Sequence, residues 1–201
     1  MTKASFAVLI VGVDDAVVEA DLVGGLLLCP HCGAPMRPWG RARWREVRGR
    51  VGSERRRPRR AICSLCRHTQ VLIIEDCLAR RRDSVEVIAA ALVEKAGGAG
   101  RRSIARLLGR HESTVACWLR RFGEMAVRIR EHFTAWAQVL DPCHEAIEPA
   151  GSPFADAVEA IGVVTRLAVR RFGPRAPFVL ASVLTEGGLL ATRAHPYRAV
   201  I

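Results

Sequence analysis

Four cysteines arranged as two Cys-x-x-Cys pairs are the residues of this sequence best suited to a defined chemistry. They are Cys29, Cys32, Cys63 and Cys66. Two such pairs supply four thiolates, a ligand set that Zn²⁺ accepts in closed, tetrahedral structural sites. The spacing therefore predicts one structural zinc ion held by a zinc ribbon, a small β module, over residues 26–76.

Each pair needs a tight turn that directs both sulfur atoms toward one point. Gly33 follows the first pair at the position where such a turn takes a positive φ, which glycine tolerates. Arg67 occupies the corresponding position after the second pair and departs from that pattern. The alternative is a pair of redox-active or incidental Cys-x-x-Cys motifs, but no thioredoxin-like βαβ pattern surrounds them.

The net charge of +11 indicates a polyanionic partner, with nucleic acid favoured over a membrane surface. The charge is concentrated in two segments. Residues 37–70 carry twelve arginines against Glu46 and Glu54, and residues 101–140 carry eight arginines against three glutamates. A run of charge is usually a solvated surface, but this one has almost no acids to balance it, which favours contact with phosphates.

The seven cysteines are an odd number, and four are assigned to the metal. That usage fits a reducing compartment better than a secreted disulfide framework, and Cys77, Cys117 and Cys143 are expected to be small buried hydrophobes. The apolar residues 5–13 are too short to span a bilayer and lack a convincing signal-peptide cleavage site. We expect a cytoplasmic protein, nucleoid-associated when bound, with no membrane partner and no small-molecule substrate.

Two small segments precede the helical part of the chain. Residues 1–25 predict a buried strand at 6–11 and a short helix capped by Asp14 or Asp15. In the ribbon, residues 26–28 and 71–74 predict strands, and residues 49–60 predict an exposed loop. Alternation with period two predicts one strand that displays its arginines on a single face. These candidate DNA-binding residues are Arg41, Arg43 and Arg45.

Residues 83–122 carry the pattern of a helix-turn-helix. Ala105 is small enough for a second helix to cross closely, Gly109 suits the sharp turn, and Val115 and Trp118 fall on the inner face of the next helix. An ordinary helical hairpin is the alternative. The basic setting favours the helix-turn-helix, and its candidate DNA-binding residues are Arg101, Arg102, His111, Glu112, Ser113, Thr114, Arg120 and Arg121.

The remaining chain predicts helices joined by a linker. Residues 123–140 form a long helix whose apolar seam over 126–140 is either core or a surface for self-association. Residues 141–153 are a Pro- and Gly-containing linker. Residues 154–201 predict C-terminal helices, the first capped by Ser152. The fold class is therefore mainly α, with a small β zinc ribbon, a three-helix helix-turn-helix domain and C-terminal helices.

These motifs resemble those of a family of uncharacterised proteins from GC-rich bacteria that join a Cys-x-x-Cys ribbon to a helix-turn-helix and are known only as a domain of unknown function. The resemblance extends over roughly residues 20–190, and it rests on residues 29–33, 37–40, 59–61, 83–91 and 104–122. The same order is similar to the N-terminal, DNA-recognising part of several insertion-sequence transposases. The resemblance implies sequence-directed binding of double-stranded DNA, linked to a mobile element.

Three functions are compatible with these features. The first is a non-catalytic, zinc-dependent DNA-binding protein, either a transcriptional regulator or a transposition accessory. The second is a protein-interaction adaptor built on the zinc ribbon. The third, a transposase, requires clustered carboxylates that hold two divalent metals on a rigid fold. The acids after the helix-turn-helix lie on predicted helices or in the linker, so the sequence predicts no enzymatic activity.

Overall fold

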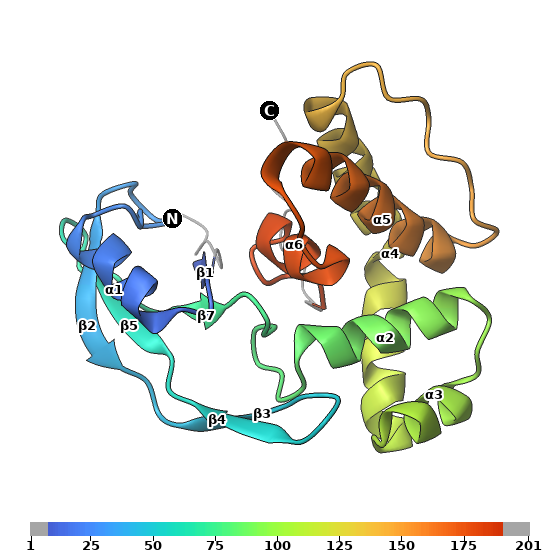
Figure 1. Cartoon of the computed structure of the whole chain (residues 1–201), viewed down its shortest axis with the longest axis horizontal. Coiled ribbons are helices and arrows are strands. Elements are labelled where there is room, and N and C mark those ends of the chain that lie inside the picture. The colour runs from blue at the N-terminus through green and yellow to red at the C-terminus, as the bar shows by residue number, and fades with distance from the viewer. Residues whose placement is uncertain (1–7, 191–201) are drawn as a thin grey trace, which may run out of the picture. The chain divides into compact units, whose positions relative to one another are not determined.

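The computed structural model describes residues 8–190 (Figure 1). The chain divides into two compact units. We call residues 8–84 with 182–187 the β unit, and residues 85–181 with 188–190 the helical unit. The predicted strand at 6–11 begins before residue 8, and the predicted C-terminal helices over 154–201 extend beyond residue 190. Those parts of the two predictions lie outside the described residues.

The β unit is built from one helix and seven short strands. In chain order these are β1 (Ile10–Val11), α1 (Asp15–Val23), β2 (Met36–Arg41), β3 (Arg45–Arg48), β4 (Ser53–Arg56), β5 (Arg59–Cys63), β6 (Thr69–Val71) and β7 (Ile73–Ile74). The strands form an antiparallel sheet in the order β2-β5-β6, a separate β3–β4 hairpin, and a parallel β1–β7 pair. The helix α1 lies beside β2 and β5 (Figure 1).

The core of the β unit is small and includes two of the cysteines. Val18 and Leu22 of α1 pack in one cluster with Met36, Cys29 and Cys63. Asp14 caps α1 as predicted, because its carboxylate accepts the Ala16 N–H at 2.8 Å. The helix ends at Val23, and Gly24 is its C-cap.

Three predictions for the β unit are wrong. Residues 26–28 contribute a single bridge, between Leu28 and Pro35, rather than a strand. Residues 71–74 are divided between β6 and β7, which belong to different sheets. The predicted loop at 49–60 contains the hairpin strand β4, because strands made of charged residues lack the apolar alternation that marks a strand in sequence.

The predicted single strand through Arg41, Arg43 and Arg45 is also wrong. β2 ends at Arg41 and β3 begins at Arg45, so the three arginines do not share one strand face. The cause lies just before Arg41: Gly40 adopts a positive φ of 75°, and the register of β2 against β5 shifts between Pro38 and Arg41. Such a bulge rotates the chain and interrupts period-two alternation.

The helical unit contains α2 (Val85–Ala96), α3 (Arg101–Leu108), α4 (Glu112–Leu140), α5 (Pro153–Phe172) and most of α6 (Pro177–Leu184), whose last residues belong to the β unit. The helices α2, α3 and α4 pack on one another, and α5 lies along α4 (Figure 1). As predicted, Ser152 caps α5, because its hydroxyl accepts the Ala155 N–H at 3.2 Å.

The predicted break between the helix-turn-helix and a long helix over 123–140 is wrong. α4 is one helix of 29 residues that runs through Gly123. A glycine inside a helix weakens it without ending it, because its backbone can still make every helical hydrogen bond. The second helix of the helix-turn-helix is therefore the first part of α4.

The apolar seam of α4 belongs to the core. Ile129 and Phe133 are fully buried, and α4 and α5 form the most extensive packing between any two described elements. The ring of Phe122 of α4 packs at a tilt against the ring of Phe154 of α5, with their centroids 4.7 Å apart. Self-association through this seam is unsupported, because α5 of the same chain covers α4. Phe172, at the end of α5, is exposed.

Candidate metal centre and nucleic-acid interface

The four cysteines predicted as ligands converge in the β unit. All four Sγ atoms lie within 4.8 Å of one another. Cys29 and Cys66 approach to 3.7 Å between their Sγ atoms, and Cys32 and Cys63 approach to 3.4 Å. The turn after β5 places Cys66 near Cys63, and the turn after α1 brings the first pair to the same point.

This arrangement fits a tetrahedral metal ion. Zn–S bonds of about 2.3 Å directed to the corners of a tetrahedron hold sulfur atoms about 3.8 Å apart, close to these two separations. The backbone N–H groups of Leu65 and Cys66 each donate to Cys63 Sγ at 3.4 Å. Such donors stabilise a thiolate, which is the form that ligates metal.

The thiols of the second pair have divergent acidities. Burial acts to raise the pKa of Cys63. Hydrogen bonds from the backbone N–H groups of Cys66 and Leu65 and from the thiols of Cys32 and Cys66 together outweigh it and lower the pKa to about 6. The backbone hydrogen bond from His68 acts to lower the pKa of Cys66, but burial and the neighbouring thiols raise it to about 12. Negative charge on one sulfur thus opposes ionisation of the next, and a bound cation would relieve that opposition.

Both cysteine turns use a positive φ. Gly33 has a φ of 73° and Arg67 a φ of 61°. The predicted turn geometry is confirmed at both positions, although one carries a side chain that disfavours it. A left-handed backbone costs a non-glycine residue about 1–2 kcal/mol, so the second turn is strained where the first is not.

The helix-turn-helix geometry is set by Gly109. This residue caps α3 in the left-handed conformation, with φ 60° and ψ 39°, and the chain enters α4 three residues later. The Arg110 guanidinium donates to the carbonyls of Leu108 and Gly109, at 3.1 and 3.3 Å, which stabilises the turn. Val115 and Trp118 are buried on the inner face of α4, as predicted.

The predicted DNA-binding residues at the start of α4 differ in their surroundings. His111 is the N-cap, since its Nδ1 accepts the Ser113 N–H at 3.3 Å and lies 2.7 Å from the Ser113 hydroxyl. Ser113 is nevertheless exposed, and Thr114 is half-buried. Along the helix, Ser113, Ala116 and Arg120 recur at intervals of three and four residues, so they share one face opposite the buried side.

Glu112 serves a local structural role. Its carboxylate accepts from Arg101 at 2.6 Å and lies 3.5 Å from Arg102 Nε. These contacts connect the first turn of α3 to the first turn of α4, where the helix dipole also stabilises the negative charge of Glu112. Arg102 remains 81% exposed in its side chain.

The predicted residues one and two turns further along α4 also have partners. Arg120 donates to Glu124 at 2.6 Å, and this hydrogen bond and charge raise the pKa of the Arg120 guanidinium above its ordinary value. The Arg121 Nε donates to Cys117 Sγ at 3.2 Å. The exposed pair of Arg120 with Glu124 is weak in water, so a phosphate can replace Glu124 at little cost.

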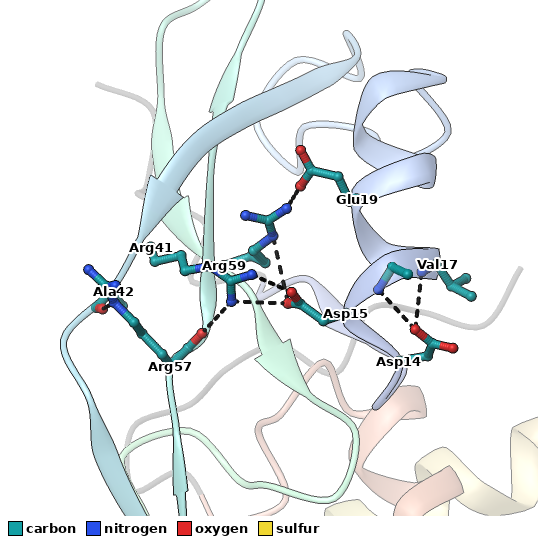
Figure 2. A network of polar contacts seen from close by, with 9 residues as sticks. Asp14, Asp15, Val17, Glu19, Arg41, Ala42, Arg57 and Arg59 are labelled. Carbon is teal, nitrogen blue, oxygen red and sulfur yellow. Dashed lines mark hydrogen bonds and ion pairs between the residues drawn. The ribbon is translucent and has the colours of Figure 1, made fainter.

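The predicted arginines of the β unit have unequal surroundings. Arg41 pairs with Asp15 of α1 and donates to the Arg57 carbonyl at 3.3 Å, while Arg59 pairs with Glu19 (Figure 2). Arg45 is half-buried beside Cys77. Of the three predicted phosphate contacts in this unit, Arg43 is therefore the exposed residue for which no carboxylate partner occurs among residues 8–190.

Sequence reasoning missed two groups of exposed residues. Arg106 lies one turn after Arg102 on α3 and is exposed, so the two share a face. Their spacing of four residues was the available signal. The second group is Trp44 with Arg55 and Arg57, whose proximity depends on the hairpin register and could not be read from spacing within one segment.

Comparison with known families identifies residues 80–124 as a homeodomain-like domain. The match covers α2, α3 and the first part of α4, so the predicted helix-turn-helix is confirmed. It spans less than half of the chain and assigns this segment rather than the whole. No curated protein and no solved structure matches the chain. No helix among residues 8–190 is both long enough and apolar enough to span a bilayer.

Proposed function

We propose that this chain is a non-catalytic, zinc-dependent protein that binds double-stranded DNA, as a transcriptional regulator or a transposition accessory. The observation that carries the proposal is the homeodomain-like match over α2, α3 and the start of α4. In domains of this class the third helix lies in the major groove, and the preceding helix and the turn contact the backbone.

The binding face proposed for the helical unit follows from exposure and charge. The outer side of α4 presents Ser113, Ala116 and Arg120, and α3 presents Arg102 and Arg106. Small side chains on α4 let the helix approach base edges, but only Arg120 is a strong reader of guanine. Affinity is therefore proposed to come mainly from phosphate contacts, with modest sequence specificity.

Zinc is proposed to stabilise the β unit. The four sulfur atoms are arranged for one tetrahedral ion, and Cys29 and Cys63 belong to the small core of the unit. When bound, the ion would cross-link the turn after α1 to the turn after β5 and supply folding energy rather than reactivity. A cytoplasmic location is proposed because reduced thiolates are needed at this site.

The proposal of a non-catalytic role rests on the surroundings of the acids in the helical unit. Glu124 pairs with Arg120, Asp156 with Arg130, and Glu159 with Arg166. These carboxylates support helix packing and surface pairing. Metal-dependent cleavage of supercoiled DNA by the pure protein would contradict the non-catalytic role and support the transposase hypothesis.

The test is selection of bound fragments from a random duplex pool by the whole, zinc-loaded protein. We expect enrichment of a short motif, and we expect Arg120→Ala to lose preference for that motif while retaining weak binding to all duplexes. Val127→Ala is the matched control, because Val127 is exposed on α4 two turns beyond Arg120. Failure to retain any duplex would favour the adaptor and exclude the proposed function.

A further inference from the structure

The outer face of the β3–β4 hairpin carries an exposed aromatic ring set among guanidinium groups. Trp44 immediately precedes β3 and is 55% exposed. The guanidinium carbons of Arg55 and Arg57 lie 5.3 and 5.9 Å from the centroid of its ring. We call these three residues the Trp44 platform.

The hairpin register explains why these residues meet. Arg45 pairs with Arg56 and Glu46 pairs with Arg55, so Trp44 and Arg57 continue the ladder on the same face as Arg55. The Arg57 Nε also donates to the Ala42 carbonyl at 3.3 Å, which restrains that side chain. The hairpin register and this hydrogen bond, rather than burial, therefore position the side chains of the platform.

The positive charge on this part of the hairpin is largely uncompensated. Residues 43–57 contain seven arginines and two glutamates. Glu54 pairs with Arg56, which also contacts Asp76, and Arg48 pairs with Asp83. Of the other five arginines, Arg45 is half-buried. The four that are exposed form no ion pair with a carboxylate over the part of the chain that the structure describes; they are Arg43, Arg50, Arg55 and Arg57.

We propose that the Trp44 platform binds an unpaired segment of nucleic acid, with one base stacked on Trp44 and the neighbouring phosphates held by Arg55 and Arg57. Positive charge selects a polyanion, and an exposed indole ring offers a stacking face that every base can use. In a duplex the faces of the bases are already stacked on one another, so this ring requires a strand with a free base.

The inference rests on the proposed function in the choice of nucleic acid as partner, but it uses a different surface. The helix-turn-helix would bind duplex, while the hairpin would bind strand that is melted, nicked or overhanging. Glu46 is an acid on the platform face, opposite Arg55, and it opposes phosphate there. Replacing Glu46 should therefore raise the affinity for nucleic acid, whereas replacing the arginines should lower it.

The experiment measures binding of the whole, zinc-loaded protein to a labelled single-stranded oligonucleotide of about 16 nucleotides, the upper site size of compact single-strand modules. Trp44→Ala should weaken binding by about 5- to 150-fold, the equivalent of losing one stacked base, and Trp44→Phe should restore most of it. Arg55→Ala with Arg57→Ala should reduce the slope of log K against log salt by about 1.4, since each single-strand phosphate contact contributes about 0.7. Glu46→Gln should strengthen binding.

Trp39→Ala is the matched control, because Trp39 is 48% exposed on β2 of the same unit. Equal loss in Trp39→Ala and Trp44→Ala would overturn the assignment of the platform, as would unchanged binding in Trp44→Ala. A duplex probe separates this inference from the proposed function. If Arg102→Ala with Arg106→Ala weakens duplex binding while single-strand binding is unchanged, both surfaces are supported. If the protein binds duplex but no single strand, the inference alone fails.

Discussion

The folds of the two units are stabilised by different kinds of interior. The helical unit has long helices and an apolar interior in which Phe122, Ile129 and Phe133 are fully buried. The β unit has strands of two to six residues, and its main core cluster incorporates Cys29 and Cys63. An interior whose packing residues include candidate metal ligands is expected to depend on the proposed zinc ion, whereas the helical unit is expected to keep its fold without it.

Within each unit, some arginines are paired with acids and others are exposed. On the α1 side of the β unit, Arg41 and Arg59 are neutralised by Asp15 and Glu19 (Figure 2). In the helical unit, Arg102 and Arg106 are exposed on one face of α3. A high count of arginines in a segment therefore overstates the charge available to a partner, because the surrounding fold decides which guanidinium groups remain free.

The largest effect should come from removing the metal. With a chelator, or in Cys63→Ser, we expect amides of β2, β5 and β6 to lose protection from hydrogen exchange, while amides of α2, α4 and α5 keep theirs. The prediction that Cys143 is buried is wrong, because it is exposed. It therefore supplies the control, since Cys143→Ser should leave both metal content and protection unchanged. Simultaneous loss of protection in both units would contradict the difference between them.

The converse change targets the helical unit. Phe133→Ala removes a fully buried ring, which should cost about 3–5 kcal/mol in the free energy of unfolding of this unit. Chemical denaturation followed through the helical signal measures the loss. Metal content should stay at one ion per chain, and Val139→Ala, at an exposed position of the same helix, should cost less than about 0.5 kcal/mol. Loss of metal in Phe133→Ala would mean that the units are not independent.

The two cysteine turns give a comparison inside the β unit. Arg67→Gly should stabilise the metal-loaded protein by about 1 kcal/mol, because glycine adopts the φ of 61° without strain. Gly33→Ala should destabilise it by about the same amount, although a Cβ there would meet open space. Melting temperatures of the two loaded variants should move in opposite directions, and a lower value for Arg67→Gly would refute the strain.

The smallest effect concerns two glycines of the helix-turn-helix. At Gly123, inside α4, an added Cβ would lie 3.7 Å from Phe154, an ordinary contact, so Gly123→Ala should stabilise by about 0.5–1 kcal/mol. At Gly109 the space is also open, but φ is 60°, so Gly109→Ala should destabilise by about 1 kcal/mol. Thermal unfolding of both variants separates backbone conformation from packing. Shifts of the melting temperature in the same direction for both variants would contradict the expected role of backbone conformation at Gly109.

Much of this structure could be predicted where one residue type determines local geometry. The four cysteines, the turn glycines Gly33 and Gly109, and the Ser152 cap each specify a conformation through their own chemistry. The buried positions of α4 followed from helical periodicity. The confirmed features are thus those in which spacing within one segment carries the information.

The features that sequence reasoning missed depend on pairing between segments. The bulge at Gly40 separates Arg41 from Arg45, and the hairpin register brings Arg55 and Arg57 to Trp44. The continuity of α4 through Gly123 depends on its packing against α5, which outweighs the weak local preference of glycine against helix. Ion pairs such as Arg41 with Asp15 likewise join residues far apart in the chain.

The central claim, that the helical unit binds duplex DNA, is tested most directly by salt dependence. The slope of log K against log salt should be measured for a duplex probe with the whole protein and with Arg102→Ala combined with Arg106→Ala. Each phosphate contact contributes about 0.9 to this slope in B-DNA, so losing two should flatten it by about 1.8. A complex whose affinity is insensitive to salt, or whose slope is unchanged in the double variant, would contradict this account.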